Sequence, residues 1–478
     1  MMMKRALGNF FFKSLAVFAL AAALVVPAMA GEMAEVDLGL QSKSAIGQKR
    51  LLAVAVKFPG QIPSIPLEKL KYKVEKVFTS YVAEQSYGLA AIIPDFRGYV
   101  ALPDPLEDYR VSPHNAQVDS GRVRKLIEDT VTALEKDVRF SDYDFMLIIP
   151  AVKTGFGDGY GMVCYCANPG MLTPIAKKRK NDPFRAFGRE GKVETVRSKN
   201  GQEFKGGITV GTDNANVGMF AHDYFHALGG MYGDRRYAPC LYDYKSQSTL
   251  TPSPGAIQHS LISIYMGPWD IMSQNFVKPG EPPQGLSSFT KIRLGWIKKD
   301  QVISVKPGET RLAALSALSG AGSVHVIKIP VDEDTHYLIE NRQPVGFDKI
   351  LPDSGMLVLE VRRLQSDGTG PVRLKSASDE PGFVKATYKL EDPARNSFHD
   401  RKNNIAVLPL WMDGDALNVL VTTPERSGEA LRAALSILEL KNAGPEKVAA
   451  LNEAVRFFES FDFEKSLAAS KGTSQVGQ

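Results

Sequence analysis

The sequence of 478 residues is poor in cysteine and in long apolar segments. Its three cysteines, Cys164, Cys166 and Cys240, allow at most one disulfide within the chain and leave one thiol over. After residue 30 no apolar stretch approaches the ~20 residues of a bilayer span, which excludes further membrane-spanning segments. No internal repeat is visible, which excludes a repeat architecture.

A large excess of charge of either sign is also absent. The formal net charge is +5, and the first thirty residues contribute three basic and no acidic side chains, so the remainder carries +2. This balance favours neither nucleic acid nor an anionic membrane as a partner. The remaining length exceeds what one hydrophobic core usually serves, so we expect two or three domains.

The first thirty residues have the pattern of a cleavable signal peptide. Three basic residues precede an apolar stretch over residues 15–26, and Ala28 and Ala30 place small residues at the cleavage site. No cysteine follows that stretch, so a lipid anchor is not indicated. We therefore expect cleavage after Ala30 and a secreted or periplasmic product with no membrane anchor.

The cysteines favour a disulfide in an oxidising compartment. Cys164 and Cys166 are too close in the sequence to pair easily, so we expect Cys240 to bond to one of them. The alternative is a zinc site that uses the cysteines. A fourth ligand is missing for such a site, and C-x-C is a weak signal.

Hydrophobic patterns divide the chain into regions. After a polar leader over residues 31–50, alternating apolar runs and helical periodicity over residues 51–300 predict an α+β domain with a mixed sheet backed by helices. Short alternating segments separated by Gly, Pro, Asp and Asn predict a β-rich domain over residues 301–425. Residues 426–470 predict a helical hairpin, and residues 471–478 a disordered tail.

The predicted elements of the α+β domain alternate along the chain. A basic run at residues 177–180 is interpreted as a solvated loop. The expected helices are 67–83, 118–138 and 217–229. The expected strands are 51–56, the pair 87–94 and 98–102, 145–150, and an edge strand at 206–211.

Two histidines four residues apart, His222 and His226, carry the clearest chemical signal. On a helix that ends at Gly229 and Gly230, both imidazoles lie on one face and can reach one metal ion. The pattern H-D-x-x-H differs from the H-E-x-x-H of zinc metallopeptidases because Asp223 stands where the catalytic Glu would be.

The third ligand of such a metal site is left open by the residues alone. A catalytic zinc needs three protein ligands and one open position for water. At the spacing of an H-x-x-x-H-x-x-G-x-x-H motif the third ligand would be Tyr232, and a neutral phenol is a poor zinc ligand. Asp234 and Asp243 are the nearby carboxylates, and His259 is a further candidate.

Short motifs around the histidine pair match one known family in order. Residues 220–229, F-A-H-D-Y-F-H-A-L-G, are followed by L-Y-D at 241–243, G-P-W-D-I-M at 267–272 and L-G-W at 294–296. Flanking motifs are S-Y-G at 86–88, F-S-D-Y-D at 140–144, E-N-R-Q at 340–343 and L-P-D-S-G at 351–355. Through these motifs most of the mature chain resembles the immune inhibitor A family of secreted bacterial zinc metallopeptidases.

The resemblance implies a zincin-like metallopeptidase domain followed by a β-rich, sandwich-like domain. It implies one catalytic Zn²⁺ bound by His222, His226 and, through the L-Y-D match, Asp243. It also implies that Asp223 is the general base acting on a zinc-activated water, and that Met272 packs beneath the metal. The expected substrate is a protein or peptide. Calcium is compatible with the family, but no residue is assigned to it.

Three departures from the family pattern bear on activity. The Asp223 side chain is one carbon shorter than Glu, and a misplacement of about 1 Å can cost roughly a hundredfold in rate. Phe225 replaces the usual Gly, and an apparent insertion over residues 232–239 moves Asp243 to 17 residues after His226. The sequence therefore predicts a secreted zinc-dependent endopeptidase, or a homologue without hydrolytic activity that serves as a binding or scaffold protein. A metal-free surface adhesin built on the β-rich domain and the helical hairpin is a third interpretation, which predicts partner binding by the isolated region 302–423.

Overall fold

The computed structural model describes residues 36–111, 119–153, 164–167, 195–233, 235–248 and 261–472, with only the backbone of residues 164–167. The chain from Asp37 onward forms one compact unit. The predicted signal peptide, the basic run at 177–180 and most of the predicted tail lie outside the described residues. Within the described ranges no helix is long and apolar enough to cross a membrane.

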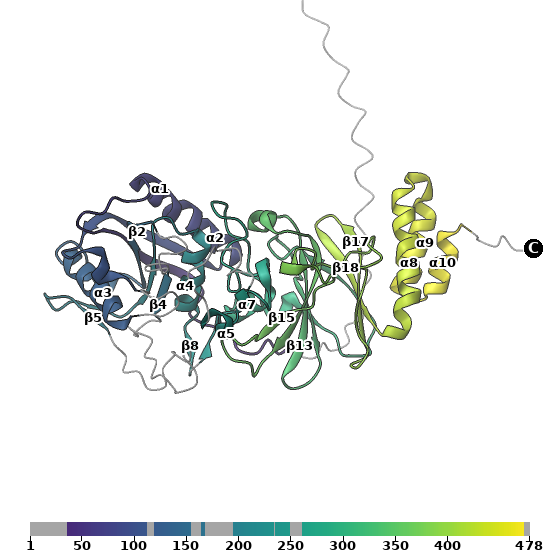
Figure 1. The fold of residues 1–478 in the computed structure, drawn as a ribbon. Helices are drawn as coiled ribbons and strands as arrows, with labels where there is room; N and C mark the ends of the chain where they lie inside the picture. Colours follow the sequence, from purple (N-terminus) through teal and green to yellow (C-terminus); the bar gives the residue numbers. More distant parts are fainter. Residues whose placement is uncertain are drawn as a thin grey trace, which may run out of the picture. The chain divides into compact units, whose positions relative to one another are not determined.

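The first region of the structure corresponds to the α+β domain predicted over residues 51–300. A five-stranded mixed sheet with the order β2-β1-β3-β7-β4 forms its centre (Figure 1). Its parallel strands are β1 (Gly47–Lys57), β2 (Ala90–Ala101), β3 (Phe145–Pro150) and β7 (Gly207–Gly211), and β4 (Cys164–Ala167) is antiparallel to β7. Residues 51–56 and 145–150 are buried throughout. Their continuous apolar runs fit strands that are covered on both faces. The predicted α+β class is confirmed.

Helices cover the two faces of this sheet. The helical stretch from α1 (Leu67–Tyr72) to α2 (Thr79–Gln85) continues through a π-helical segment, and α3 (Ser120–Leu134) begins at the N-cap Asp119. The apolar side of α3 shares one core with alternate residues of β1, β3 and β7. On the opposite face, α4 (Val217–Gly229) packs Tyr224 against Phe145 of β3, with ring centroids 5.1 Å apart.

Two of the strand predictions are wrong. Residues 87–102 do not form a strand pair, because residues 90–101 run as the single strand β2 alongside β1. The strand at residues 207–211 is not an edge strand, because β4 pairs with its outer side. In both cases pairing with distant residues decided the strand's place in the sheet.

The β-rich region consists of two sheets that face each other across a shared core. The first has the order β10-β12-β13-β14-β15, and the second β11-β18-β17-β16. The strands of the first sheet are β10 (Val302–Ser304), β12 (Val326–Pro330), β13 (Thr335–Arg342), β14 (Gly355–Arg362) and β15 (Val372–Leu374). Those of the second are β11 (Arg311–Ser316), β16 (Phe398–Asp400), β17 (Ile405–Asp413) and β18 (Ala416–Thr422).

Three helices follow the strands and lie side by side in Figure 1. They are α8 (Pro424–Asn442), α9 (Val448–Glu459) and α10 (Phe463–Ser470), and they cover the outer face of β17 and β18 with a separate apolar core. The predicted hairpin corresponds to α8 and α9. The third helix begins where Asp462 accepts a hydrogen bond from the Lys465 N–H (3.2 Å).

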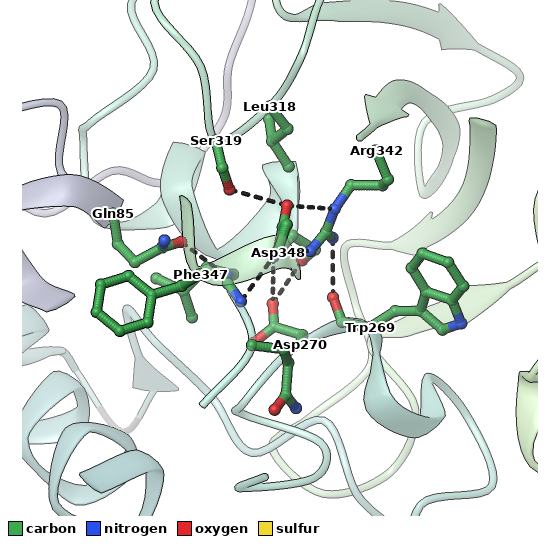
Figure 2. Close-up of polar contacts among 12 residues, drawn as sticks. Gln85, Trp269, Asp270, Leu318, Ser319, Arg342, Phe347 and Asp348 are labelled. Carbon is green, nitrogen blue, oxygen red and sulfur yellow. Dashed lines mark hydrogen bonds and ion pairs between the residues drawn. The ribbon is translucent and has the colours of Figure 1, made fainter. Parts of the chain in front are cut away.

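A buried ion network joins the β-rich region to residues 269–288. The Arg342 guanidinium donates to both oxygens of Asp348 (3.0 and 2.7 Å), to Glu340 (3.0 Å) and to the Trp269 carbonyl (3.0 Å). Figure 2 shows Arg342 between Asp348 and the Trp269 carbonyl. The same two carboxylates accept from backbone N–H groups of the first region, Asp348 from Gly285 and Glu340 from Ser288. The network therefore fixes the two regions against each other.

Replacing Arg342 by Met will leave the carboxylates of Glu340 and Asp348 buried without the guanidinium that they share. We expect the free energy of unfolding to fall by about 3–5 kcal/mol, the usual cost of removing one partner of a buried ion pair. Urea unfolding followed by tryptophan fluorescence measures the loss. The control Arg97→Met removes a solvent-accessible ion pair with Asp95 (2.8 Å) and should cost less than about 1 kcal/mol. Equal losses would contradict the central role of Arg342.

Candidate metal centre

The helix α4 places His222 and His226 on one face, as their spacing predicts. Asn216 caps its first turn by accepting from the Gly218 N–H (2.8 Å). Gly230, with a φ of 70°, ends it in a conformation that favours glycine. Twelve of its thirteen residues are buried. Tight packing therefore holds the histidine-bearing helix rigidly.

Backbone carbonyls orient both imidazole rings. His222 Nδ1 lies 2.9 Å from the Ile271 carbonyl oxygen, and His226 Nδ1 lies 2.6 Å from the Ala238 carbonyl oxygen. A carbonyl only accepts hydrogen bonds, so each Nδ1 carries the proton. The two Nε2 atoms therefore present lone pairs to each other at 3.1 Å. A backbone carbonyl that accepts from the second ring nitrogen is typical of metal-ligating histidines.

The apparent insertion over residues 232–239 brings a third ligand atom to the pair. It contains a hairpin of β8 (Met231–Tyr232) and β9 (Arg235–Arg236), after which the chain returns to α4. The Cys240 sulfur then lies 3.2 Å from His226 Nε2 and 3.6 Å from His222 Nε2. His222, His226 and Cys240 form the one group in the described part of the chain whose ligand atoms converge in this way.

The dimensions of this group fit a zinc ion. Zinc binds nitrogen at about 2.05 Å and sulfur at about 2.3 Å, so tetrahedral angles place two nitrogens about 3.3 Å apart and a nitrogen and sulfur about 3.6 Å apart. The observed separations are 3.1 Å between nitrogens and 3.2 and 3.6 Å between nitrogen and sulfur. Two facing lone pairs repel each other unless a cation lies between them. Three protein ligands account for three of the four tetrahedral positions of zinc.

Burial sets the protonation of the three groups. It lowers the pKa of His222 to about 4 and the pKa of His226 well below its usual value, so both rings are neutral at pH 7. Burial also raises the pKa of the Cys240 thiol, so the sulfur keeps its proton when no metal is bound. Metal binding would deprotonate the thiol, because the thiolate is the ligating form.

Hydrogen-bond donors around the Cys240 sulfur would stabilise that thiolate. The Arg236 guanidinium lies 3.9 Å away, the Tyr242 hydroxyl hydrogen-bonds to the sulfur, and the Tyr244 hydroxyl lies beside it. Tyr242 also stacks on His222, with ring centroids 5.8 Å apart. The structure brings Tyr242 and Tyr244 to the site, whereas Tyr232 is 63% exposed.

The carboxylate predicted as third ligand does not belong to the converging group. The Asp243 carboxylate accepts from the Lys245 N–H (3.2 Å) and the Ser246 hydroxyl (2.8 Å) at the start of α5 (Tyr244–Ser248). Its backbone N–H donates to the Ile262 carbonyl (2.7 Å). The other two candidates, Asp234 and His259, lie outside the described residues.

The other residues singled out in the sequence, Asp223, Phe225 and Met272, are all buried. Asp223 follows His222 on α4 and is buried. Phe225 packs edge-on against Trp296, with ring centroids 5.4 Å apart, so the core accommodates its ring. Met272 is fully buried, and its carbonyl accepts from the Leu241 N–H (2.8 Å). The turn that contains Met272 also provides the Ile271 carbonyl to His222.

Cys240 is a free, buried thiol in the structure, so the expected disulfide between Cys240 and Cys164 or Cys166 is not formed. The side chains of Cys164 and Cys166 lie outside the described part. The sequence signal for Cys240 as a ligand was weak: a cysteine shortly after a histidine pair. An oxidising compartment favours a disulfide at such a cysteine.

Scans against models of known protein families match none of them, and a search of curated protein sequences finds no match to this chain. The resemblance to the immune inhibitor A family thus depends on the short motifs themselves.

Denaturing the protein in a chelator without reductant, and alkylating it with iodoacetamide, should label Cys240 in full, because its thiol is free. The native protein should resist the reagent, since the side chain is buried and its pKa is raised. Peptide mass spectrometry measures both, with a reduced sample as control. A Cys240 peptide linked to Cys164 or Cys166 would contradict the free thiol.

Proposed function

We propose that His222, His226 and Cys240 bind one zinc ion and that the protein is a secreted zinc-dependent endopeptidase with a zincin-like first domain. The convergence of three ligand atoms at separations that suit tetrahedral zinc supports this proposal most strongly. The histidine-bearing helix packed on a mixed sheet, and the F-A-H-D and W-D-I-M motifs, support the peptidase assignment. Three protein ligands with one position left for water are typical of catalytic rather than structural zinc.

The residues of the site have distinct roles in this proposal. The Nε2 atoms of His222 and His226 hold the metal, and the Ile271 and Ala238 carbonyls keep both rings in the ligating tautomer. Asp223 takes the proton of the attacking water and passes it to the leaving amine. When bound, zinc would supply Lewis acidity toward the substrate carbonyl and the water.

A binding or scaffold protein without hydrolytic activity is the second candidate. Two observations favour it: Asp223 has a shorter reach than Glu, and the ligand side chains are buried, with His222 4% and Cys240 2% exposed. It would keep the metal centre for stability and lack turnover. Metal analysis and peptide hydrolysis measured on the same sample separate the two functions.

Elemental mass spectrometry of the chain from Gly31 onward should find one zinc per molecule. The variants His222→Ala and Cys240→Ala should lose it, because each removes a ligand. Asp243→Asn is the matched control and should keep one zinc, since its carboxylate caps α5. Loss of zinc in Asp243→Asn together with retention in Cys240→Ala would establish the carboxylate implied by the family pattern as third ligand.

Casein hydrolysis tests the peptidase activity. We expect activity in the zinc-loaded protein, its loss with a chelator, and a fall of at least a hundredfold in Asp223→Asn with zinc content unchanged. Asp223→Glu should keep or raise the rate, because it restores the longer reach of the base. Inactivity of both the zinc-loaded wild type and Asp223→Glu would establish the binding or scaffold protein instead.

A further inference from the structure

The connection between β14 and β15, residues 363–371, reaches from the β-rich region to Cys240. The Asp367 carboxylate accepts a hydrogen bond from the Cys240 N–H, and the Gly368 N–H donates to the Cys240 carbonyl (3.0 Å). The Gly368 carbonyl accepts from the Tyr244 N–H (3.0 Å). Both backbone polar groups of Cys240 are therefore held by a loop more than 120 positions away in the sequence.

The Asp367 carboxylate also orders the polar groups around the sulfur. It forms an ion pair with Arg236, with 3.8 Å between Nε and Oδ2, and it hydrogen-bonds to the Tyr244 hydroxyl. Arg236 and Tyr244 are two of the groups that contact the Cys240 sulfur. One carboxylate thus holds the backbone of Cys240 and two of the side chains that lie beside its sulfur.

Gly368 allows the loop to come this close. Its φ is 66°, and a Cβ at this position would lie 2.2 Å from a ring carbon of Tyr244. A side chain would therefore collide with the tyrosine and strain the backbone. The close approach places the Gly368 amide and carbonyl within reach of Cys240 and Tyr244.

We propose that Asp367 and Gly368 are positioning residues that make Cys240 the third ligand, so that the β-rich region completes the metal centre. The inference rests on the proposed zinc site. His222 and His226 are fixed by a buried helix. Cys240 follows a hairpin, and its backbone is held by hydrogen bonds to the β14–β15 loop. A ligand held in place before the metal arrives loses less conformational entropy on binding, which raises affinity. Loss of a residue that hydrogen-bonds to a metal ligand typically lowers metal affinity by about 10–100-fold.

Zinc affinity of the full chain, measured by competition with a chromogenic chelator, tests the proposal. We expect Asp367→Ala to weaken zinc binding by about 10–100-fold, and Gly368→Ala to act in the same direction through the displaced loop. Asp367→Asn keeps an acceptor for the Cys240 N–H, so it should recover part of the affinity. Asp353→Ala is the matched control, because it removes a carboxylate of the same region that pairs with Arg395 and Lys389 (both 2.7 Å).

Cobalt substitution provides a readout that lost stability alone would not change. With Co²⁺ in place of zinc, the thiolate gives a charge-transfer band, which should weaken in Asp367→Ala and remain in Asp353→Ala. Wild-type zinc binding with unchanged affinity and cobalt spectrum in Asp367→Ala would overturn this inference and leave the metal centre intact. Absence of zinc binding by the wild type would overturn the proposed function and the inference together.

Discussion

The buried ion network around Arg342 is the interaction on which the arrangement of the site depends. The guanidinium donates to the Trp269 carbonyl, and two residues later in the same turn the Ile271 carbonyl accepts from His222. Asp270, between them, accepts from the Met272 N–H (2.8 Å) and the Ser287 hydroxyl (2.6 Å). A buried charge network of this kind is costly to desolvate and tolerates few alternative packings. The network holds the turn at residues 269–272 in place, and the Ile271 carbonyl of that turn orients the His222 ring.

The proposed metal centre has two structural sources. The helix α4 provides His222 and His226 from a core that packs on the mixed sheet. Cys240 comes from the end of a hairpin and is held by the β14–β15 connection. The family pattern has a carboxylate as third ligand, and a thiolate carries the same single negative charge. The exchange would keep the net charge of the centre while presenting a softer ligand, which suits zinc.

Much of the fold could be predicted where local pattern and tertiary environment agree. The apolar runs of β1 and β3, the helix α4 and most strands of the β-rich region follow from periodicity and from Gly and Pro punctuation. The strand β11 (Arg311–Ser316) has no clear strand pattern, because Leu and Ala favour helices, and its pairing with β18 overrides that preference. The internal place of β7 was missed because β4 lies beyond a long glycine-rich and basic stretch.

The sequence by itself determined the helix at residues 217–229 and the placement of two histidines on one face, because both depend on neighbours within a few residues. Only the tertiary structure decided which side chain joins them. Asp243 and Cys240 lie close together in the sequence, and the L-Y-D motif favours Asp243. The choice depends on hydrogen bonds to Asp367 and Gly368 and on the capping of α5 by Asp243. Contacts between residues more than 120 positions apart leave no periodic trace in the sequence.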